Sequence, residues 1–249
     1  MAPREPQPKY LEPLLGVVFD LDGTLVVSQH DFQRMRREII RLAERNGVMP
    51  GHLKVTDPTH KLLEAARAEL QADNFPAGLV YRFDAEVTHT IDEIELEALP
   101  RTVARSGAEP LLKGLTERGF RVGLLTRSSE RFCRAALART GLAPYFPYLR
   151  TRSAPGPAKP SPEALLGLLV EMGVPVSRAL FVGDHFIDAQ CAVHAGVRFY
   201  GVLPEPGEQN PMTAERFLAG GAAAVAKDLN DLAHQLSVAA PIEGVHASS

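Results

Sequence analysis

The sequence contains few cysteines, no strong excess of either charge and no long apolar run. Two cysteines among 249 residues, Cys133 and Cys191, are too few for a disulfide framework, and we expect both to be small buried hydrophobic residues. A formal net charge of −3 argues against a nucleic-acid-binding surface. No apolar stretch approaches the roughly 20 residues that a membrane-spanning helix needs. The composition therefore predicts a protein that neither binds nucleic acid nor spans a membrane.

The two ends of the chain differ in amino-acid composition from the part between them. Residues 1–13 contain four prolines and several charges and lack the apolar core of a signal peptide, which predicts a cytoplasmic protein. We expect residues 1–13 and 239–249 to be flexible. The length, with 45% hydrophobic residues, is enough for one core domain and a smaller second domain.

Apolar runs alternate with helical patterns over much of the chain. The segments 16–20, 120–126 and 179–183 are almost continuously apolar, as in strands that are covered on both faces. Further strands are expected at 148–151 and 197–203, with a helical pattern between successive strands. This alternation predicts an α/β fold with a doubly wound parallel sheet.

Residues 28–105 interrupt this alternation. Their apolar residues recur at helical spacing, as in Phe32, Met35, Ile39 and Leu42, and no convincing buried strand is present. We therefore predict an all-helical cap domain over 28–105, inserted between two parts of a core domain at 14–27 and 106–238.

Polar residues fall where the expected strands end. Asp20 and Asp22 close the first strand, Thr126 ends the second, Asp184 follows a later one, and Lys159 lies in a loop just before a helix. Ligands of open α/β sheets bind beyond the carboxyl ends of the strands, so these groups are expected to converge. Neighbouring carboxylates repel each other and favour a divalent cation, while a hydroxyl and an ammonium group suit a phosphate.

Each of these residues also has a simpler interpretation when it is taken alone. Asp22 and Gly23 could form a hairpin turn, Thr126 could cap a helix, and Lys159 could be solvated. Asp184 and Asp188 could be the N-cap and first-turn acids of a helix. One shared site accounts for all of these placements at once, and we therefore predict such a site.

Four segments in order carry the candidate chemistry: Asp20-Leu21-Asp22-Gly23-Thr24, Leu124-Leu125-Thr126-Arg127-Ser128, Lys159, and Gly183-Asp184-His185-Phe186-Ile187-Asp188. Together they resemble the motifs of the haloacid dehalogenase-like hydrolase superfamily, and within it the helical-cap phosphatases that include phosphoglycolate phosphatase. The resemblance covers about residues 17–203 and implies the core fold and inserted cap of that group.

The resemblance implies a role for each acidic residue. Asp20 would be the nucleophile that forms an aspartyl-phosphate, and Asp22 the general acid that later acts as a base. Mg²⁺ would be held by Asp20, by Asp184 and by the backbone carbonyl of Asp22, with Asp188 as a further ligand or an orienting group. Dehalogenases of the superfamily lack an acid at the position of Asp22, so the resemblance favours phosphoryl chemistry.

The remaining motif residues are implied to bind the phosphoryl group. Thr126 and the backbone amides near Gly23 would hold its oxygens, and Lys159 would neutralise the nucleophile and the transferring group. Arg127 would reach the phosphate or form a surface salt bridge. His185 would hydrogen-bond a metal ligand or be a packed or solvated surface residue.

The function implied is a Mg²⁺-dependent phosphatase whose partner is a small phosphorylated metabolite. Three alternatives remain open on the sequence. A sugar phosphomutase of the same superfamily shares all four motifs, a phosphonate-cleaving relative would use a cap lysine, and a non-catalytic binding or regulatory module would share only the fold.

Overall fold

The computed structural model describes residues 13–71, 78–205 and 210–238. The chain divides into two compact units, which we name the core unit (Met1–Val27 with Thr102–Ser249) and the helical unit (Ser28–Arg101). The ends expected to be flexible, residues 1–13 and 239–249, lie outside the described residues apart from Pro13.

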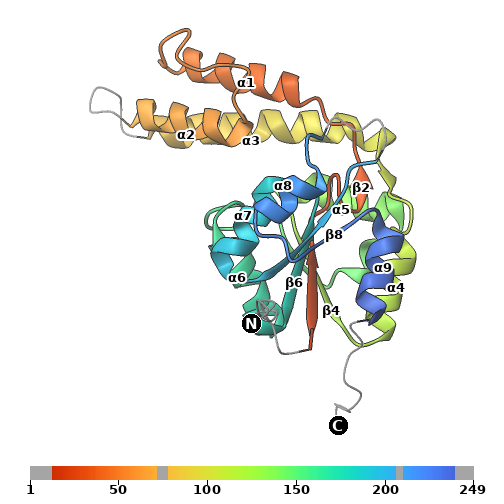
Figure 1. The fold of residues 1–249 in the computed structure, drawn as a ribbon. Coiled ribbons are helices and arrows are strands. Elements are labelled where there is room, and N and C mark those ends of the chain that lie inside the picture. The colour runs from red at the N-terminus through yellow and green to blue at the C-terminus, as the bar shows by residue number, and fades with distance from the viewer. Residues whose placement is uncertain (1–12, 72–77, 206–209, 239–249) are drawn as a thin grey trace, which may run out of the picture. The chain divides into compact units, whose positions relative to one another are not determined.

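A six-stranded sheet forms the centre of the core unit (Figure 1). Its strands are, in spatial order, β5 (Tyr148–Arg150), β4 (Arg121–Leu125), β1 (Gly16–Phe19), β6 (Ala179–Gly183), β7 (Arg198–Val202) and β8 (Ala224–Ala226), and neighbours pair in parallel. Every residue of β1 is buried, as its unbroken apolar run requires of a strand covered on both faces. The predicted α/β fold with a doubly wound parallel sheet is confirmed.

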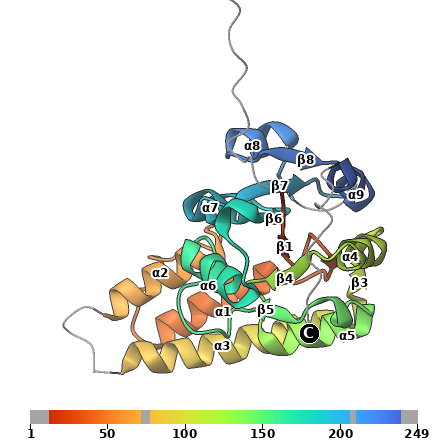
Figure 2. The ribbon, with the colours of Figure 1, turned by 90° about the horizontal axis from the view of Figure 1, so that it is seen from below.

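Helices cover both faces of this sheet (Figure 2). The helices α6 (Pro162–Met172) and α7 (Phe186–Ala195) lie on one face, and α4 (Ala108–Glu117) and α9 (Leu229–Val238) lie on the other. The core unit also contains α5 (Glu130–Thr140), α8 (Ala214–Ala219) and single-turn 3₁₀ helices at Ala143–Tyr145 and Val176–Arg178. Cys133 and Cys191 are both free and buried, as predicted.

Two short strands of the core unit were not expected. Strand β2 (Val26–Val27) pairs antiparallel with β3 (Val103–Ala104), beside the points where the chain leaves and re-enters this unit. Residues 102–105 belong to the core unit in the structure, whereas the sequence placed them in the helical insertion. The three-residue edge strand β8 was also not expected.

The helical unit packs three helices around its own apolar core. These are α1 (Phe32–Arg45), α2 (Thr59–Leu70) and α3 (Leu79–Ala98), followed by a 3₁₀ turn at Leu99–Arg101. Their apolar residues recur at helical spacing and are buried together, although Phe32 is 49% exposed. None of the described helices is both long and apolar enough to cross a membrane.

Candidate active site

The parallel register brings three predicted site residues to one edge of the sheet. Phe19, the last residue of β1, lies beside Leu124 of β4 and Val182 of β6. Asp20 follows Phe19, and its N–H donates to the Val182 carbonyl at 2.9 Å. The carboxyl ends of the three strands therefore place Asp20, Thr126 and Asp184 at the same edge.

Three carboxylates form a buried cluster there. Oxygen atoms of Asp20, Asp184 and Asp188 all lie within 4.8 Å of one another, and the three residues are 7%, 6% and 2% exposed. Hard oxygen ligands at this spacing fit a divalent cation such as Mg²⁺. The Asp22 side chain is half-buried and is not part of this cluster.

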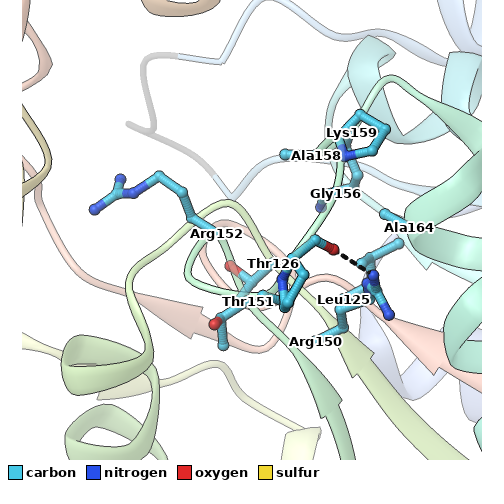
Figure 3. Close-up of a pocket in the computed structure, with 12 residues that line it drawn as sticks. Leu125, Thr126, Arg150, Thr151, Arg152, Gly156, Ala158, Lys159 and Ala164 are labelled. Carbon is cyan, nitrogen blue, oxygen red and sulfur yellow. Dashed lines mark hydrogen bonds between the residues drawn. The ribbon is translucent and has the colours of Figure 1, made fainter. Parts of the chain in front are cut away.

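Lys159 brings a buried positive charge to the same cluster. Its Nζ lies 2.5 Å from Oδ1 of Asp20 and 2.7 Å from Oδ1 of Asp188, and 5.4 Å from the ring centroid of Phe181. The residue is 4% exposed although it comes from a loop rich in proline and glycine, between β5 and α6. Lys159 and Thr126 are among the residues that line one pocket (Figure 3). The interpretation of Lys159 as a solvated loop residue is therefore wrong.

Burial and mutual repulsion make the ionised form of these carboxyl groups unfavourable, so the pKa values of Asp20 and Asp184 are raised. Burial raises the pKa of Asp20 from 3.8 to about 7, with the charge of Lys159 opposing this shift and that of Asp188 adding to it. Burial also raises the pKa of Asp184 well above its ordinary value, and the charges of Asp20 and Asp188 add to this effect. For Lys159, burial lowers the pKa, but the two neighbouring aspartates outweigh it and raise the pKa overall.

These pKa shifts predict that cation binding displaces protons. Below pH 7 the cation-free cluster holds a proton on Asp20 that a bound Mg²⁺ must displace, and the raised pKa of Asp184 adds to this competition, so apparent affinity should rise with pH through 7. Calorimetry in buffers of different ionisation enthalpy should show more proton release at pH 6 than at pH 8. Asp184→Asn should reduce that release, and equal release at both pH values would contradict the prediction.

The turn after β1 is fitted closely around Asp184. Gly23 has a φ of +85°, and a Cβ on it would lie 2.3 Å from Oδ2 of Asp184, so a larger residue has neither the backbone freedom nor the space. The Thr24 hydroxyl donates to Oδ1 of Asp184 at 2.8 Å. The N–H of Gly23 itself donates to the Val26 carbonyl, so any phosphoryl oxygen near this turn would meet a neighbouring amide instead.

One contact of Asp184 was not predicted from the sequence. Asn210 donates through Nδ2 to the carboxylate of Asp184 at 2.8 Å and to its carbonyl at 3.0 Å. Together with Thr24, it fixes the orientation of this carboxylate. No sequence pattern connects these two residues, which are 26 positions apart.

His185 and Asp188 cap the first turn of α7. The N–H of His185 donates to Oδ2 of Asp188 at 3.1 Å, and Nδ1 of His185 accepts from the Ile187 N–H at 3.3 Å. Asp188 is thus both a first-turn acid and a member of the buried cluster. Its two oxygens accept from the His185 N–H and from Lys159, which holds the carboxylate rigidly in place.

Thr126 and Arg127 follow β4. The Thr126 hydroxyl oxygen accepts from the Ser128 N–H at 3.1 Å, which leaves its own proton available as a donor. Arg127 is half-buried, and its carbonyl accepts from Arg152 at 3.3 Å. That these residues bind a phosphoryl group stays a prediction.

Comparisons with known proteins agree on one family. The model of the haloacid dehalogenase-like hydrolase family matches residues 14–196. A phosphoglycolate phosphatase of Pseudomonas savastanoi pv. phaseolicola is 33% identical over 195 residues, which cover 73% of this chain and 66% of that protein. A phosphoglycolate phosphatase of Cereibacter sphaeroides is 31% identical over 192 residues, covering 74% and 83%.

A solved structure extends the likeness of fold to most of the chain. It is a hydrolase of the same family from Deinococcus radiodurans R1 that was crystallised with bound phosphate and sodium. It superposes with a TM-score of 0.61 at 21% identity and covers 91% of this chain and 96% of its own.

Proposed function

The chain belongs to the haloacid dehalogenase-like hydrolase family, and from this membership we propose that it is a Mg²⁺-dependent phosphatase acting on a small phosphomonoester. The observation that carries the proposal is the buried contact of Asp20 with Lys159 beside Asp184 and Asp188. A carboxylate nucleophile, a cation-binding cluster and an ammonium group are the parts that phosphoryl transfer needs in one place.

The proposed reaction proceeds in two displacements. A carboxylate oxygen of Asp20 attacks phosphorus in line, and the bond from phosphorus to the leaving oxygen breaks as Asp22 donates its proton to that oxygen. Asp22 then takes a proton from a water molecule, which attacks phosphorus and releases inorganic phosphate from Asp20. Because Asp22 is half-buried and outside the carboxylate cluster, it can exchange protons with substrate and solvent.

The surrounding groups hold and neutralise the transferring group. Asp20, Asp184 and the backbone of Asp22 would hold Mg²⁺, with Asp188 as a further ligand or an orienting group. The bound cation would offset negative charge on the phosphoryl oxygens. Lys159 keeps a positive charge beside the nucleophile. Thr126, with its hydroxyl proton free of the Ser128 contact, would donate to a phosphoryl oxygen.

The known relatives indicate which substrate should be tested first. The two relatives from Pseudomonas and Cereibacter are phosphoglycolate phosphatases, and this chain spans 66% and 83% of their lengths. Phosphoglycolate is therefore the first substrate to try.

A phosphate-release screen tests the proposal. The purified chain is assayed with phosphoglycolate, sugar phosphates, nucleotides and pyrophosphate, with and without Mg²⁺, and we expect release from at least one monoester that depends on Mg²⁺. Transfer of the phosphoryl group to a second position of a sugar phosphate, without net release, would instead indicate a phosphomutase. Absence of both reactions would contradict the proposal and favour a binding module.

A further inference from the structure

Arg105 is a buried cation at the point where the chain re-enters the core unit. It directly follows β3, and its side chain is 1% exposed. Its backbone N–H donates to the Leu25 carbonyl at 2.9 Å, and its own carbonyl accepts from Ala108 at 3.1 Å, at the start of α4. The backbone of Arg105 is therefore tied to the turn after β1 on one side and to a helix on the other.

The guanidinium group of Arg105 joins two segments that are far apart in sequence. Nη1 donates to the Gly23 carbonyl at 2.5 Å, Nη2 donates to the Leu203 carbonyl at 3.1 Å, and Nε donates to the Glu205 carboxylate at 3.3 Å. Gly23 lies in the turn after β1, whereas Leu203 and Glu205 follow β7. Three acceptors in different directions suit the planar fork of arginine, whose donors are spread over three nitrogen atoms in a fixed geometry.

The turn that Arg105 holds is the turn that carries Asp22. Within it the Gly23 N–H donates to the Val26 carbonyl, and Thr24 donates to Asp184. Gly23 therefore has its N–H bound inside the turn and its carbonyl bound by Arg105. The Gly23 carbonyl is part of the peptide that joins Gly23 to Thr24, so its movement would rotate this peptide, disturb the Thr24 contact with Asp184 and, through Gly23, shift the Asp22 carboxyl group.

We propose that Arg105 is a positioning residue for Asp22, holding the turn of residues 22–25 so that the Asp22 carboxyl group is aligned with the leaving oxygen of the substrate. This inference rests on the proposed function for the role of Asp22. Arg105 contacts the backbone carbonyls of Gly23 and Leu203 and the carboxylate of Glu205. Its effect on the reaction is exerted through the turn.

Comparing kcat/KM for substrates with different leaving groups shows whether a variant has a misplaced general acid or only a less stable fold. An alkyl phosphate needs a proton on its leaving oxygen, whereas p-nitrophenyl phosphate releases a stable anion that needs none. Arg105→Met should therefore lower kcat/KM about 10- to 100-fold for an alkyl phosphate, and only a few-fold for p-nitrophenyl phosphate. Arg105→Lys should recover part of the loss, because an ammonium group can still bind the Gly23 carbonyl.

Arg121→Met is the matched control. Arg121 also donates to two carbonyls, those of Met172 at 2.8 Å and Gly173 at 2.6 Å, but it lies at the start of β4, at the opposite edge of the sheet from Asp20. Its replacement should lower thermal stability and leave the ratio of kcat/KM values for the two substrates unchanged.

Hydrogen exchange gives a readout that does not depend on activity. Amides of residues 21–26 should exchange faster in Arg105→Met than in the wild type, and at the wild-type rate in Arg121→Met. Equal loss of activity on both substrates, or unchanged exchange in this segment, would overturn the role of Arg105. If the wild type itself released no phosphate, the proposed function would fail. Faster exchange of residues 21–26 in Arg105→Met would then still support the role of Arg105 in holding the turn, whereas unchanged exchange would refute it.

Discussion

Replacement of Asp20 by asparagine should abolish Mg²⁺-dependent phosphate release, with kcat at least ~10³-fold lower than in the wild type. An amide is nearly the same size as a carboxyl group but cannot attack phosphorus to form an acyl phosphate. Asp20 is also a member of the carboxylate cluster and the partner of Lys159, so the substitution weakens cation binding as well. Release of inorganic phosphate from the best substrate of the screen, measured under single-turnover conditions, checks the result.

The stability of the same variant should show that turnover is lost through removal of the nucleophile and not through unfolding. Because burial raises the pKa of Asp20 from 3.8 to about 7, the neutral carboxyl group favours the folded state, and the stability it contributes is lost as pH rises through 7. Without metal at pH 8, Asp20→Asn should therefore be at least as stable as the wild type in urea. Turnover within tenfold of the wild type would rule out Asp20 as the nucleophile.

Asp228→Asn is the control for this substitution. Oδ1 of Asp228 accepts from the N–H groups of Asn230 and Asp231 at the start of α9, and an asparagine oxygen can accept both hydrogen bonds. We expect wild-type turnover from it. Loss of activity in both variants would point to a general effect of removing a carboxylate from the core unit.

The elements that could be predicted from the sequence are those whose signal lies in a single segment. The strand at 179–183 was predicted with the bounds that the structure has, because an apolar run between a helix and a glycine has one simple interpretation. The meeting of Asp20 and Asp184 was also predictable, since parallel strands bring their carboxyl ends to one edge. The placement of Lys159 beside Asp20 was specified only by the resemblance, because nothing in the loop itself indicates burial, and its contact with Asp188 was not predicted.

The elements that were missed depend on contacts between distant segments. Strand β3 has two residues, both exposed, and exists only because Val103 and Ala104 meet β2. The contacts of Asn210 with Asp184 and of Arg105 with Gly23 span 26 and 82 positions and follow no periodicity. Such contacts depend on how loops from different parts of the chain pack together, which is why a single sequence did not indicate them.

Replacement of Lys159 by methionine should have the second-largest effect, on both stability and activity. Lys159 is 4% exposed, and its ammonium group lies between Asp20 and Asp188. Removing one partner of a buried ion pair leaves uncompensated charge and destabilises a protein by about 3–5 kcal/mol. Turnover should fall on the order of 10²- to 10³-fold, because one preorganised positive group is lost beside the transferring phosphoryl group.

The loss of stability in Lys159→Met should depend on pH. Asp20 and Asp184 already have raised pKa values, and without Lys159 they take up protons more readily, so the free energy of unfolding should fall less at pH 6 than at pH 8. Urea denaturation of the metal-free protein at both pH values measures this difference. Lys113→Met, which removes an exposed lysine 3.9 Å from Glu117, should change stability by less than about 0.5 kcal/mol at either pH.

A double variant identifies the cause of the Lys159→Met effect. If buried negative charge is responsible, adding Asp20→Asn should restore part of the lost stability at pH 8, with an interaction energy of about 0.5–3 kcal/mol, while turnover stays abolished. Stability changes of the two substitutions that simply add, with no interaction energy, would show that Lys159 acts through the packing of its side chain on Phe181 instead. Because the double variant lacks the nucleophile, only its stability reports on Lys159, and a positive interaction energy would show that this lysine offsets the negative charge of the folded cluster.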